Sequence, residues 1–251
     1  MSGQLSGQVA IITGGSRGIG RAIALLFAQE GADIAFCHLH DAEGAADVTA
    51  RIEALGRRAF HAALDVAELP ALRAFMGAAE AALGPCDVLV NNAGLNLRGP
   101  FETITEEMFD RVMSVHVRAS FFAAQAVWPG MAARGRGRII TTASQLAFKG
   151  APNVVPYCTA KAALVGMTRA LAREGAPKGI LVNAIAPGPV ETDLTAQLGA
   201  DWSERIGATL PIGRVGQPEE IAAAALLLAS SPGGDFFVGA TISPNGGDLM
   251  H

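Results

Sequence analysis

The chain has 251 residues, a formal net charge of −4 and a composition that is 50% hydrophobic and 17% charged. With a mean hydropathy of +0.33, such a chain is not disordered and has to bury a large share of its side chains. The negative charge and the lack of an extended basic block exclude a nucleic-acid partner. The longest apolar stretch, Ile221–Ala229, is far shorter than the roughly 18 residues of a membrane span.

Cysteine usage and the amino-terminal sequence bear on the compartment. Cys37, Cys86 and Cys158 are odd in number and lack metal-ligand spacing, so we expect neither a disulfide framework nor a metal site. The first eight residues have no basic region before an apolar one, unlike a secretory signal. We therefore expect a cytoplasmic protein with no membrane partner.

Short β-type runs alternate along the chain with longer, Ala-rich stretches of helical pattern. We expect strands at Val9–Thr13, Asp33–His38, Arg58–Ala63, Val88–Asn91, Gly137–Thr142, Ile180–Ala186 and Ala240–Ser243. We expect helices at Arg17–Glu30, Ala42–Leu55, Leu69–Leu83, Glu106–Arg134, Tyr157–Ala176 and Pro218–Ala229. This alternation predicts an α/β fold with a parallel sheet covered by helices on both faces, in a single domain over residues 1–251.

One stretch departs from this alternation. Pro187–Gly216 holds several prolines and glycines around a short helix-like middle, just beyond the carboxyl end of a predicted strand. Long irregular segments in this position often cover a bound substrate. We expect residues 189–212 to form such a lid.

The sequence T-G-G-S-R-G-I-G, residues 13–20, joins the first strand to the first helix. Glycines at this point allow backbone N–H groups to approach a pyrophosphate at the positive end of the helix. The spacing of Gly14, Gly18 and Gly20 differs, however, from G-x-G-x-x-G and from the P-loop pattern. The alternative is a tight strand-to-helix turn that holds no ligand.

Three further clusters follow predicted strands, where ligands of parallel sheets bind. Residues 91–94 read N-N-A-G and have the small and amide side chains that would brace the first turn, although such a sequence is by itself more often only a turn. Ser144 follows the strand Gly137–Thr142. Tyr157 and Lys161 lie four residues apart, on one face of a predicted helix.

This pairing has a chemical use. A nearby ammonium in a partly dry cleft lowers the pKa of a tyrosine from its ordinary value near ~10. Tyr157 would then transfer a proton near neutral pH while Ser144 hydrogen-bonds the reacting oxygen. The alternative is a surface pair on a helix, but Tyr157 is the only tyrosine in the chain and lies where the sheet order predicts a ligand.

With these residues in order, the chain resembles the short-chain dehydrogenase/reductase family over essentially its whole length. Residues 13–20 are similar to the family's T-G-x-x-x-G-x-G turn, residues 91–94 to its N-N-A-G, and Ser144 with Tyr157 and Lys161 to its catalytic set. The resemblance implies a single Rossmann-type, doubly wound parallel sheet of about seven strands. It also implies an enzyme that transfers a hydride between a nicotinamide cofactor and a ketone or secondary alcohol, and it leans toward the 3-oxoacyl-(acyl-carrier-protein) reductases.

The same resemblance implies the cofactor contacts and the assembly. The cofactor would be held by Gly14, Ser16, Arg17, Gly18, Ile19, Gly20, His38, Asp65, Val66, Asn92, Ala93, Gly94, Tyr157, Lys161, Pro187, Gly188, Val190 and Thr192. Asp65 would lie at the adenine, although it is also suited to cap the following helix. A homotetramer is expected, packed through the helices Glu106–Arg134 and Tyr157–Ala176.

The family pattern breaks at residue 116. The family usually places an asparagine there, whose main-chain carbonyl holds a water that connects the lysine to a proton relay, and this chain has His116. Its imidazole would either take part in that relay as a fourth catalytic residue or fill the asparagine's space with a satisfied hydrogen bond, and we favour the second interpretation.

The residue that ends the second strand bears on the choice of cofactor. An acidic side chain there accepts the ribose 2′-hydroxyl of NAD(H), but His38 occupies this position. Asp33 and Asp41 lie at the wrong places, whereas Arg17 in the glycine turn is near enough to reach a 2′-phosphate. The alternative is that Arg17 is simply solvated. The sequence favours NADP(H), with NAD(H) as the alternative.

The substrate is less well defined. By their positions, Ser144, Gln145, Asn96, Phe148 and Pro189 would contact it, in a mostly apolar pocket with two amides and no anion clamp. A medium-sized ketone, a 3-oxoacyl thioester and a sugar-like polyol all suit such a pocket. A sugar or polyol dehydrogenase therefore remains an alternative, as does a sensor that binds the cofactor without turnover.

Overall fold

A parallel sheet of seven strands forms the centre of the computed structural model, which describes residues 3–196, 198–199 and 201–250. The strand order is β3-β2-β1-β4-β5-β6-β7, and every neighbouring pair is parallel. The strands are β1 Val9–Thr13, β2 Asp33–His38, β3 Ala59–Ala63, β4 Val88–Asn91, β5 Gly137–Thr142, β6 Ile180–Ile185 and β7 Thr241–Ile242. The Rossmann-type doubly wound sheet predicted from the sequence is confirmed.

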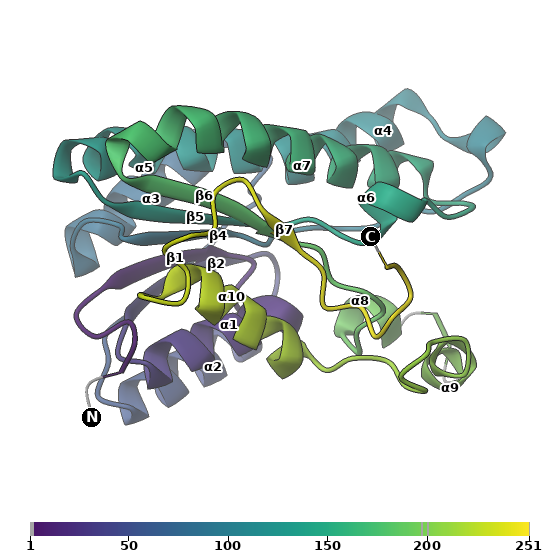
Figure 1. Ribbon diagram of the computed structural model, residues 1–251, viewed down its shortest axis with the longest axis horizontal. Coiled ribbons are helices and arrows are strands. Elements are labelled where there is room, and N and C mark those ends of the chain that lie inside the picture. Colours follow the sequence, from purple (N-terminus) through teal and green to yellow (C-terminus); the bar gives the residue numbers. More distant parts are fainter. Residues whose placement is uncertain (1–2, 197, 200, 251) are drawn as a thin grey trace.

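Helices cover both faces of this sheet (Figure 1). One face carries α1 Gly18–Gln29, α2 Ala42–Ala54 and α10 Pro218–Ala229. The other carries α3 Leu69–Leu83, α4 Glu106–Met113, α5 Ala119–Arg134 and α7 Val155–Gly175. Three short helices, α6 Leu146–Lys149, α8 Asp193–Ala196 and α9 Trp202–Gly207, lie toward the carboxyl edge of the sheet, and single turns form at η1 Phe101–Thr103 and η3 Ala176–Lys178.

Two hydrophobic cores explain why the central strands are apolar throughout. Side chains alternate along a strand, so Ile12 and Val90 enter the core beneath α1 and α10, while Ile11 and Leu89 enter the core beneath α3 and α5. All four are fully buried. A strand covered on both faces has no solvent-facing position to fill with a polar residue.

The predicted boundaries hold to within two residues, with one interruption. The expected helix Glu106–Arg134 contains a π-helical turn, η2 Ser114–Arg118, which separates α4 from α5. The segment 189–212 includes the short helices α8 and α9. No sequence signal marked the π turn, because it contains neither proline nor glycine and the apolar pattern continues through it.

The strand order reverses between β1 and β4. From β1 the chain builds β2 and β3 on one side and then crosses to β4 on the other, so the connections at the carboxyl ends of β1 and β4 diverge. Such a switch point opens a crevice in doubly wound sheets. No helix in the described part of the chain is long and apolar enough to cross a membrane.

Candidate active site

The glycine turn leaves the first turn of α1 open to a ligand. Arg17 precedes the helix without capping it, and the first turn of α1 carries no acidic residue. The N–H groups at this positive end are therefore available to an anion. Gly20 has no room for a side chain, since a methyl group there would overlap the carbonyl oxygen of Gly14. The close approach of turn and helix thus depends on glycine.

Asn92 ties the glycine turn to β4. Its Nδ2 donates to the carbonyl oxygens of Thr13 (3.2 Å) and Gly14 (3.1 Å), while the hydroxyl of Thr13 accepts the N–H groups of Asn92 (2.9 Å) and Ala93 (3.0 Å). The expectation that N-N-A-G braces the first turn is confirmed. Thr142, at the end of β5, donates to Oδ1 of Asn92 at 3.4 Å.

A cavity of about 440 Å³ lies over the carboxyl ends of these strands. It brings together most of the predicted site: Gly14, Ser16, Arg17, Gly18, Ile19, His38, Asp65, Val66, Asn92, Ala93, Gly94, His116, Tyr157, Lys161 and Thr192. Gly20, Ser144, Gln145, Asn96, Phe148, Pro187, Gly188, Pro189 and Val190 do not line it. Sequence reasoning missed Cys37, Leu39, Leu64, Arg111, Val115, Thr142 and Asp193, which do.

Asp65 pairs with one of these missed residues. Its carboxylate accepts from the N–H of Ala67 at 2.9 Å and forms an ion pair with Arg111 at 2.7 Å. It does not cap α3, as the alternative proposed, because Glu68 precedes the first residue of that helix. The pair with Arg111 is a contact between α4 and the loop after β3, which no local pattern indicates.

Tyr157 and Lys161 line one side of the cavity, and Ser144 lies next to Tyr157. The side chain of Ser144 lies close enough to the Tyr157 phenol to lower its pKa, and its Oγ accepts the N–H of Leu146 at 3.1 Å. The Nζ atom of Lys161 lies 5.4 Å from the centre of the Tyr157 ring and donates to the carbonyl oxygen of Thr142 at 2.6 Å. Lys161 is buried, with 3% of its surface exposed, so its amine has left bulk water.

Burial controls the pKa values of this group. It raises the pKa of Tyr157 to about 12, partly opposed by the side chain of Ser144. It also lowers the pKa of Lys161 to about 7. The expected lowering of the tyrosine pKa is therefore wrong for this geometry, because desolvation of the phenol is the largest influence on it and outweighs the lowering by Ser144. Tyr157 holds its proton at neutral pH.

His116 lies in the π turn and faces the loop after β4. Its Nε2 is 2.7 Å from the carbonyl oxygen of Leu95 and 3.2 Å from that residue's N–H, and its ring meets the Tyr157 ring edge to face at 5.5 Å. Gly94 makes room for it, because a methyl group at residue 94 would come within 2.6 Å of the imidazole. The main-chain carbonyl oxygen of His116 accepts a hydrogen bond from the hydroxyl of Ser120 at 2.6 Å. Its second lone pair is available to another donor.

The imidazole is held neutral. Burial lowers the pKa of His116 to about 3, with a further lowering from the positive charge of Lys161, against a small opposing effect of the Leu95 backbone. A group with this pKa does not exchange protons near neutral pH. This favours the interpretation in which His116 fills the asparagine's space and bonds the Leu95 backbone.

The end of β2 offers no carboxylate to the cavity. Asp41 caps α2 by accepting the N–H of Gly44 at 3.2 Å, and Asp33, at the opposite end of the strand, binds Arg57 and Arg58. His38 is buried and lines the cavity, and its pKa is lowered by burial and by the neighbouring His61. Both acidic side chains thus have partners away from the site.

The segment after β6 reaches the glycine turn. Val190 forms a parallel bridge with Gly216, and the hydroxyl of Thr195 accepts the N–H of Thr192 at 2.9 Å and donates to the carbonyl of Val190 at 2.9 Å. Thr192 lies against Gly18 and lines the cavity. The base of the segment 189–212 therefore lies beside the turn that begins α1.

The fold and this site define a nicotinamide-dependent oxidoreductase of the short-chain dehydrogenase/reductase family, and the chain belongs to that family. Residues 14–248 match the family model described as enoyl-(acyl carrier protein) reductase.

Similar proteins span the whole chain. The 3-oxoacyl-(acyl-carrier-protein) reductase FabG of Chlamydia trachomatis is 37% identical, covering 98% of this chain and 99% of that protein. Gluconate 5-dehydrogenase of Gluconobacter oxydans is 36% identical, covering 97% and 95%. Among solved structures, a blue fluorescent protein from a metagenomic library in complex with NADPH is 39% identical, with a TM-score of 0.92 over 98% of this chain and 100% of that one.

We expect His116→Asn to leave kcat/KM within about tenfold of the wild-type value, about 1.4 kcal/mol, because an amide can replace the bonds to Leu95. The pH dependence between about pH 5 and about pH 8 should not change, since the imidazole takes up no proton there. Steady-state kinetics over this range checks both. A much larger loss, or the disappearance of an ionisation, would show that the imidazole takes part in proton transfer.

Proposed function

We propose that the chain reduces a medium-sized ketone to a secondary alcohol with NADPH, with Tyr157 as the proton donor, Ser144 as the hydrogen-bond partner of the reacting oxygen and Lys161 as the residue that binds the nicotinamide ribose. The observation that carries this proposal is the placement of the Lys161 amine 5.4 Å from the Tyr157 ring and 2.6 Å from the carbonyl oxygen of Thr142, with Ser144 beside the phenol. The reverse reaction oxidises the alcohol.

The protonation states of Tyr157 and Lys161 at neutral pH suit the reduction of a ketone. When bound, the cofactor supplies a hydride to the carbonyl carbon, so ketone, NADPH and a proton give alcohol and NADP⁺. A phenol with a pKa of about 12 is fully protonated at neutral pH and donates that proton to the carbonyl oxygen. Lys161, with a pKa of about 7, is suited to return a proton to the phenol. His116 supports the site through Leu95 and stays neutral.

The residues of this chain fit the cofactor. The uncapped start of α1 suits the pyrophosphate, and Asp65 and Val66 line the cavity where the adenine would lie. Of the segment proposed to meet the nicotinamide, Pro187–Thr192, only Thr192 lines the cavity. NADP(H) is favoured over NAD(H) because β2 ends in His38 rather than in an acidic residue, and the carboxylate of Asp41 that follows it caps α2. Arg17 is exposed and lines both the main cavity and an adjacent cavity of about 420 Å³. Its guanidinium would bind the 2′-phosphate.

Two substrate classes fit the proposal. Similarity to FabG supports a 3-oxoacyl thioester, and similarity to gluconate 5-dehydrogenase supports a sugar-like polyol. Residues 189–212 would close over either substrate as a lid on a single domain spanning residues 1–251, and Gln145, Asn96, Phe148 and Pro189 would contact it. A sensor without turnover is the alternative from a different class.

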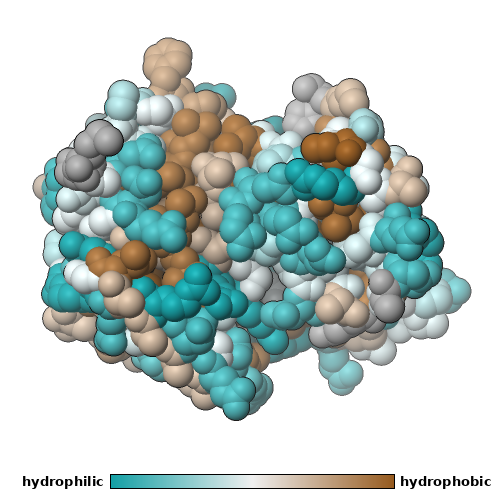
Figure 2. All heavy atoms as spheres, turned by 90° about the horizontal axis from the view of Figure 1, so that it is seen from below, coloured by the Kyte–Doolittle hydropathy of each residue, from teal (hydrophilic) through white to brown (hydrophobic). Residues whose placement is uncertain are grey.

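Surface composition supports a homotetramer. Exposed apolar side chains lie on the helices through which the family packs: Phe109, Phe121 and Val155. Others lie near α10: Leu227, Phe236 and Val238. Figure 2 views the molecule from the side of α1, α2 and α10 and shows hydrophobic side chains gathered in a band between hydrophilic areas.

Light scattering measures the number of subunits in the assembly. Cell fractionation tests the proposed cytoplasmic location.

We expect Tyr157→Phe to lower kcat by more than about a hundredfold while leaving the Kd for NADPH within about threefold, because only the proton donor is lost. Turnover is measured with ketones, 3-oxoacyl thioesters and polyols, each with NADPH and NADH or their oxidised forms, and binding by cofactor fluorescence. A protein that binds NADPH but oxidises it with no carbonyl compound would instead be a sensor.

We expect Arg17→Ala to weaken NADPH binding by about tenfold and NADH binding by less than about twofold, since only NADPH carries the 2′-phosphate. Arg51→Ala is the matched control, because Arg51 lines the adjacent cavity but not the main one. Fluorescence titration gives the four dissociation constants for each protein. Equal losses for both cofactors, or tighter NADH binding by the wild type, would contradict the assignment of Arg17.

A further inference from the structure

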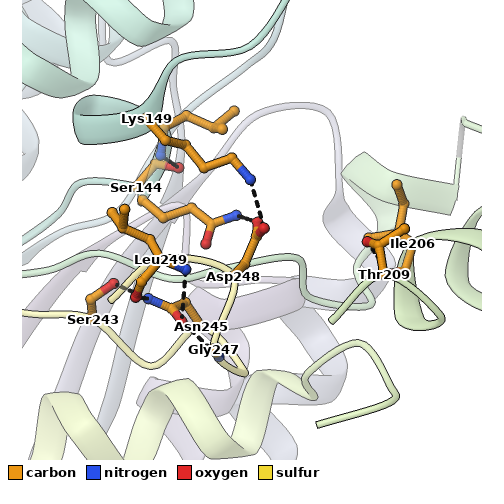
Figure 3. Close-up of polar contacts among 11 residues, drawn as sticks. Ser144, Lys149, Ile206, Thr209, Ser243, Asn245, Gly247, Asp248 and Leu249 are labelled. Carbon is orange, nitrogen blue, oxygen red and sulfur yellow. Dashed lines mark hydrogen bonds and ion pairs between the residues drawn. The ribbon is translucent and has the colours of Figure 1, made fainter. Parts of the chain in front are cut away.

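The turn that follows β7 is held in one shape by Asn245. The Nδ2 atom of this buried side chain donates to the hydroxyl of Ser243 (2.9 Å) and to the carbonyl oxygen of Leu249 (2.8 Å), and its Oδ1 accepts the N–H of Gly247 at 2.9 Å. Figure 3 shows these contacts within the turn and Asp248 pointing out of it toward Lys149. Residues 244–249 are called the carboxyl-terminal turn below.

The carboxyl-terminal turn contacts the segments that surround the substrate position. The N–H of Gly188 donates to the carbonyl of Pro244 at 3.0 Å, and the N–H of Ile212 donates to the carbonyl of Gly246 at 3.2 Å. One turn therefore contacts both the loop after β6 and the end of the proposed lid.

Asp248 extends these contacts to the residue after Ser144. One of its carboxylate oxygens accepts a hydrogen bond from Nε2 of Gln145, and the other pairs with Nζ of Lys149 at 2.6 Å. The Asp248 side chain is 19% exposed, so this contact is partly shielded from solvent. Because a carboxylate can only accept, it fixes which end of the Gln145 amide faces it.

Among the described residues, one polar atom of the Gln145 side chain, Oε1, is consequently left without a hydrogen-bond donor. The residue is 4% exposed, and its backbone N–H is bonded to the carbonyl of Pro187 at 3.1 Å. Its Oε1 is buried and finds no hydrogen-bond partner within residues 3–196, 198–199 and 201–250. A buried acceptor without a donor is unfavourable and indicates that something else supplies the donor. Ser144, which is adjacent in the chain, binds the reacting oxygen in the proposed function.

We propose that Asp248 is a positioning residue that turns Oε1 of Gln145 toward the substrate, where it accepts a hydrogen bond from a hydroxyl on the carbon next to the reacting carbonyl. This inference rests on the proposed function and specifies its substrate class. It favours hydroxyketones and polyols over 3-oxoacyl thioesters, whose reacting carbonyl lies between two methylene groups. Lys149 pairs with the other oxygen of Asp248 at 2.6 Å and so holds the carboxylate opposite the amide.

The experiment compares ketones that differ only in that hydroxyl: cyclohexanone with 2-hydroxycyclohexanone, and butan-2-one with 3-hydroxybutan-2-one. The quantity measured is the ratio of kcat/KM for the hydroxyketone to kcat/KM for the plain ketone. Hydroxyketones are intrinsically more reactive, so the ratio of each variant is compared with the wild-type ratio rather than with one.

We expect Gln145→Met to lower this ratio by about fivefold to tenfold, since it removes the acceptor at similar side-chain length. Asp248→Asn should lower it by a smaller factor, because an asparagine amide can also donate to Oε1 and lets the Gln145 amide turn over. Asp235→Asn is the matched control. It breaks an exposed ion pair with Arg138 near the start of β5, at the opposite edge of the sheet, and should leave the ratio unchanged.

The outcomes separate this inference from the proposed function. Reduction of these ketones with an unchanged ratio in both Gln145→Met and Asp248→Asn would overturn the role of Oε1 while leaving the ketone reductase intact. NADPH binding without reduction of any ketone by the wild type would overturn both. A merely structural role of Asp248 would lower the thermal midpoint and both kcat/KM values together without moving the ratio, which also counts against the proposal.

Discussion

The hydrogen bonds of Asn92 at the switch point support both halves of the site. By binding the carbonyls of Thr13 and Gly14, its amide fixes the glycine turn against β4. Its Oδ1 accepts from Thr142, whose own carbonyl holds the amine of Lys161. The glycine turn and the group of Tyr157 and Lys161 are thus joined through the ends of three adjacent strands. A shift of β4 relative to β1 would move one part relative to the other, so the distance between the glycine turn and the amine of Lys161 depends on this sheet register.

Burial sets the pKa values of Lys161 and Tyr157, and it also costs free energy because these polar groups lose hydration. A lysine amine that is 3% exposed loses hydration, and a single carbonyl at 2.6 Å replaces only part of it. The result is a pKa of about 7 for Lys161 and about 12 for Tyr157, so the phenol stays protonated at neutral pH while the amine gains and loses protons there. His116 adds no charge, because a second cation beside Lys161 would be still more costly. A neutral imidazole, like an amide, adds no charge beside Lys161 and bonds the Leu95 backbone through Nε2.

The parts of the site that could be predicted are those specified by residues close together in the sequence. The strands, the glycine turn and the Tyr157–Lys161 spacing depend on local patterns, which is why the fold and the positions of these residues were predictable. The π turn at Ser114–Arg118, the pair of Asp65 with Arg111 and the raised pKa of Tyr157 depend on tertiary packing and desolvation, which no local pattern encodes. The N-cap assignment of Asp65 failed for a related reason, since three further residues precede α3.

Asp248 shows most clearly where sequence reasoning ends. It lies 103 positions from Gln145 and belongs to the turn beyond the last strand, yet the two side chains share a hydrogen bond. The residues proposed for proton transfer lie at a strand end and on one long helix, where the sheet holds them. Residues that would recognise the remainder of a substrate come from α6, the loop after β6 and the carboxyl-terminal turn, which are joined by a few hydrogen bonds. Such contacts can change without disturbing the sheet, so one reaction can serve ketones of different shape and polarity on the same framework.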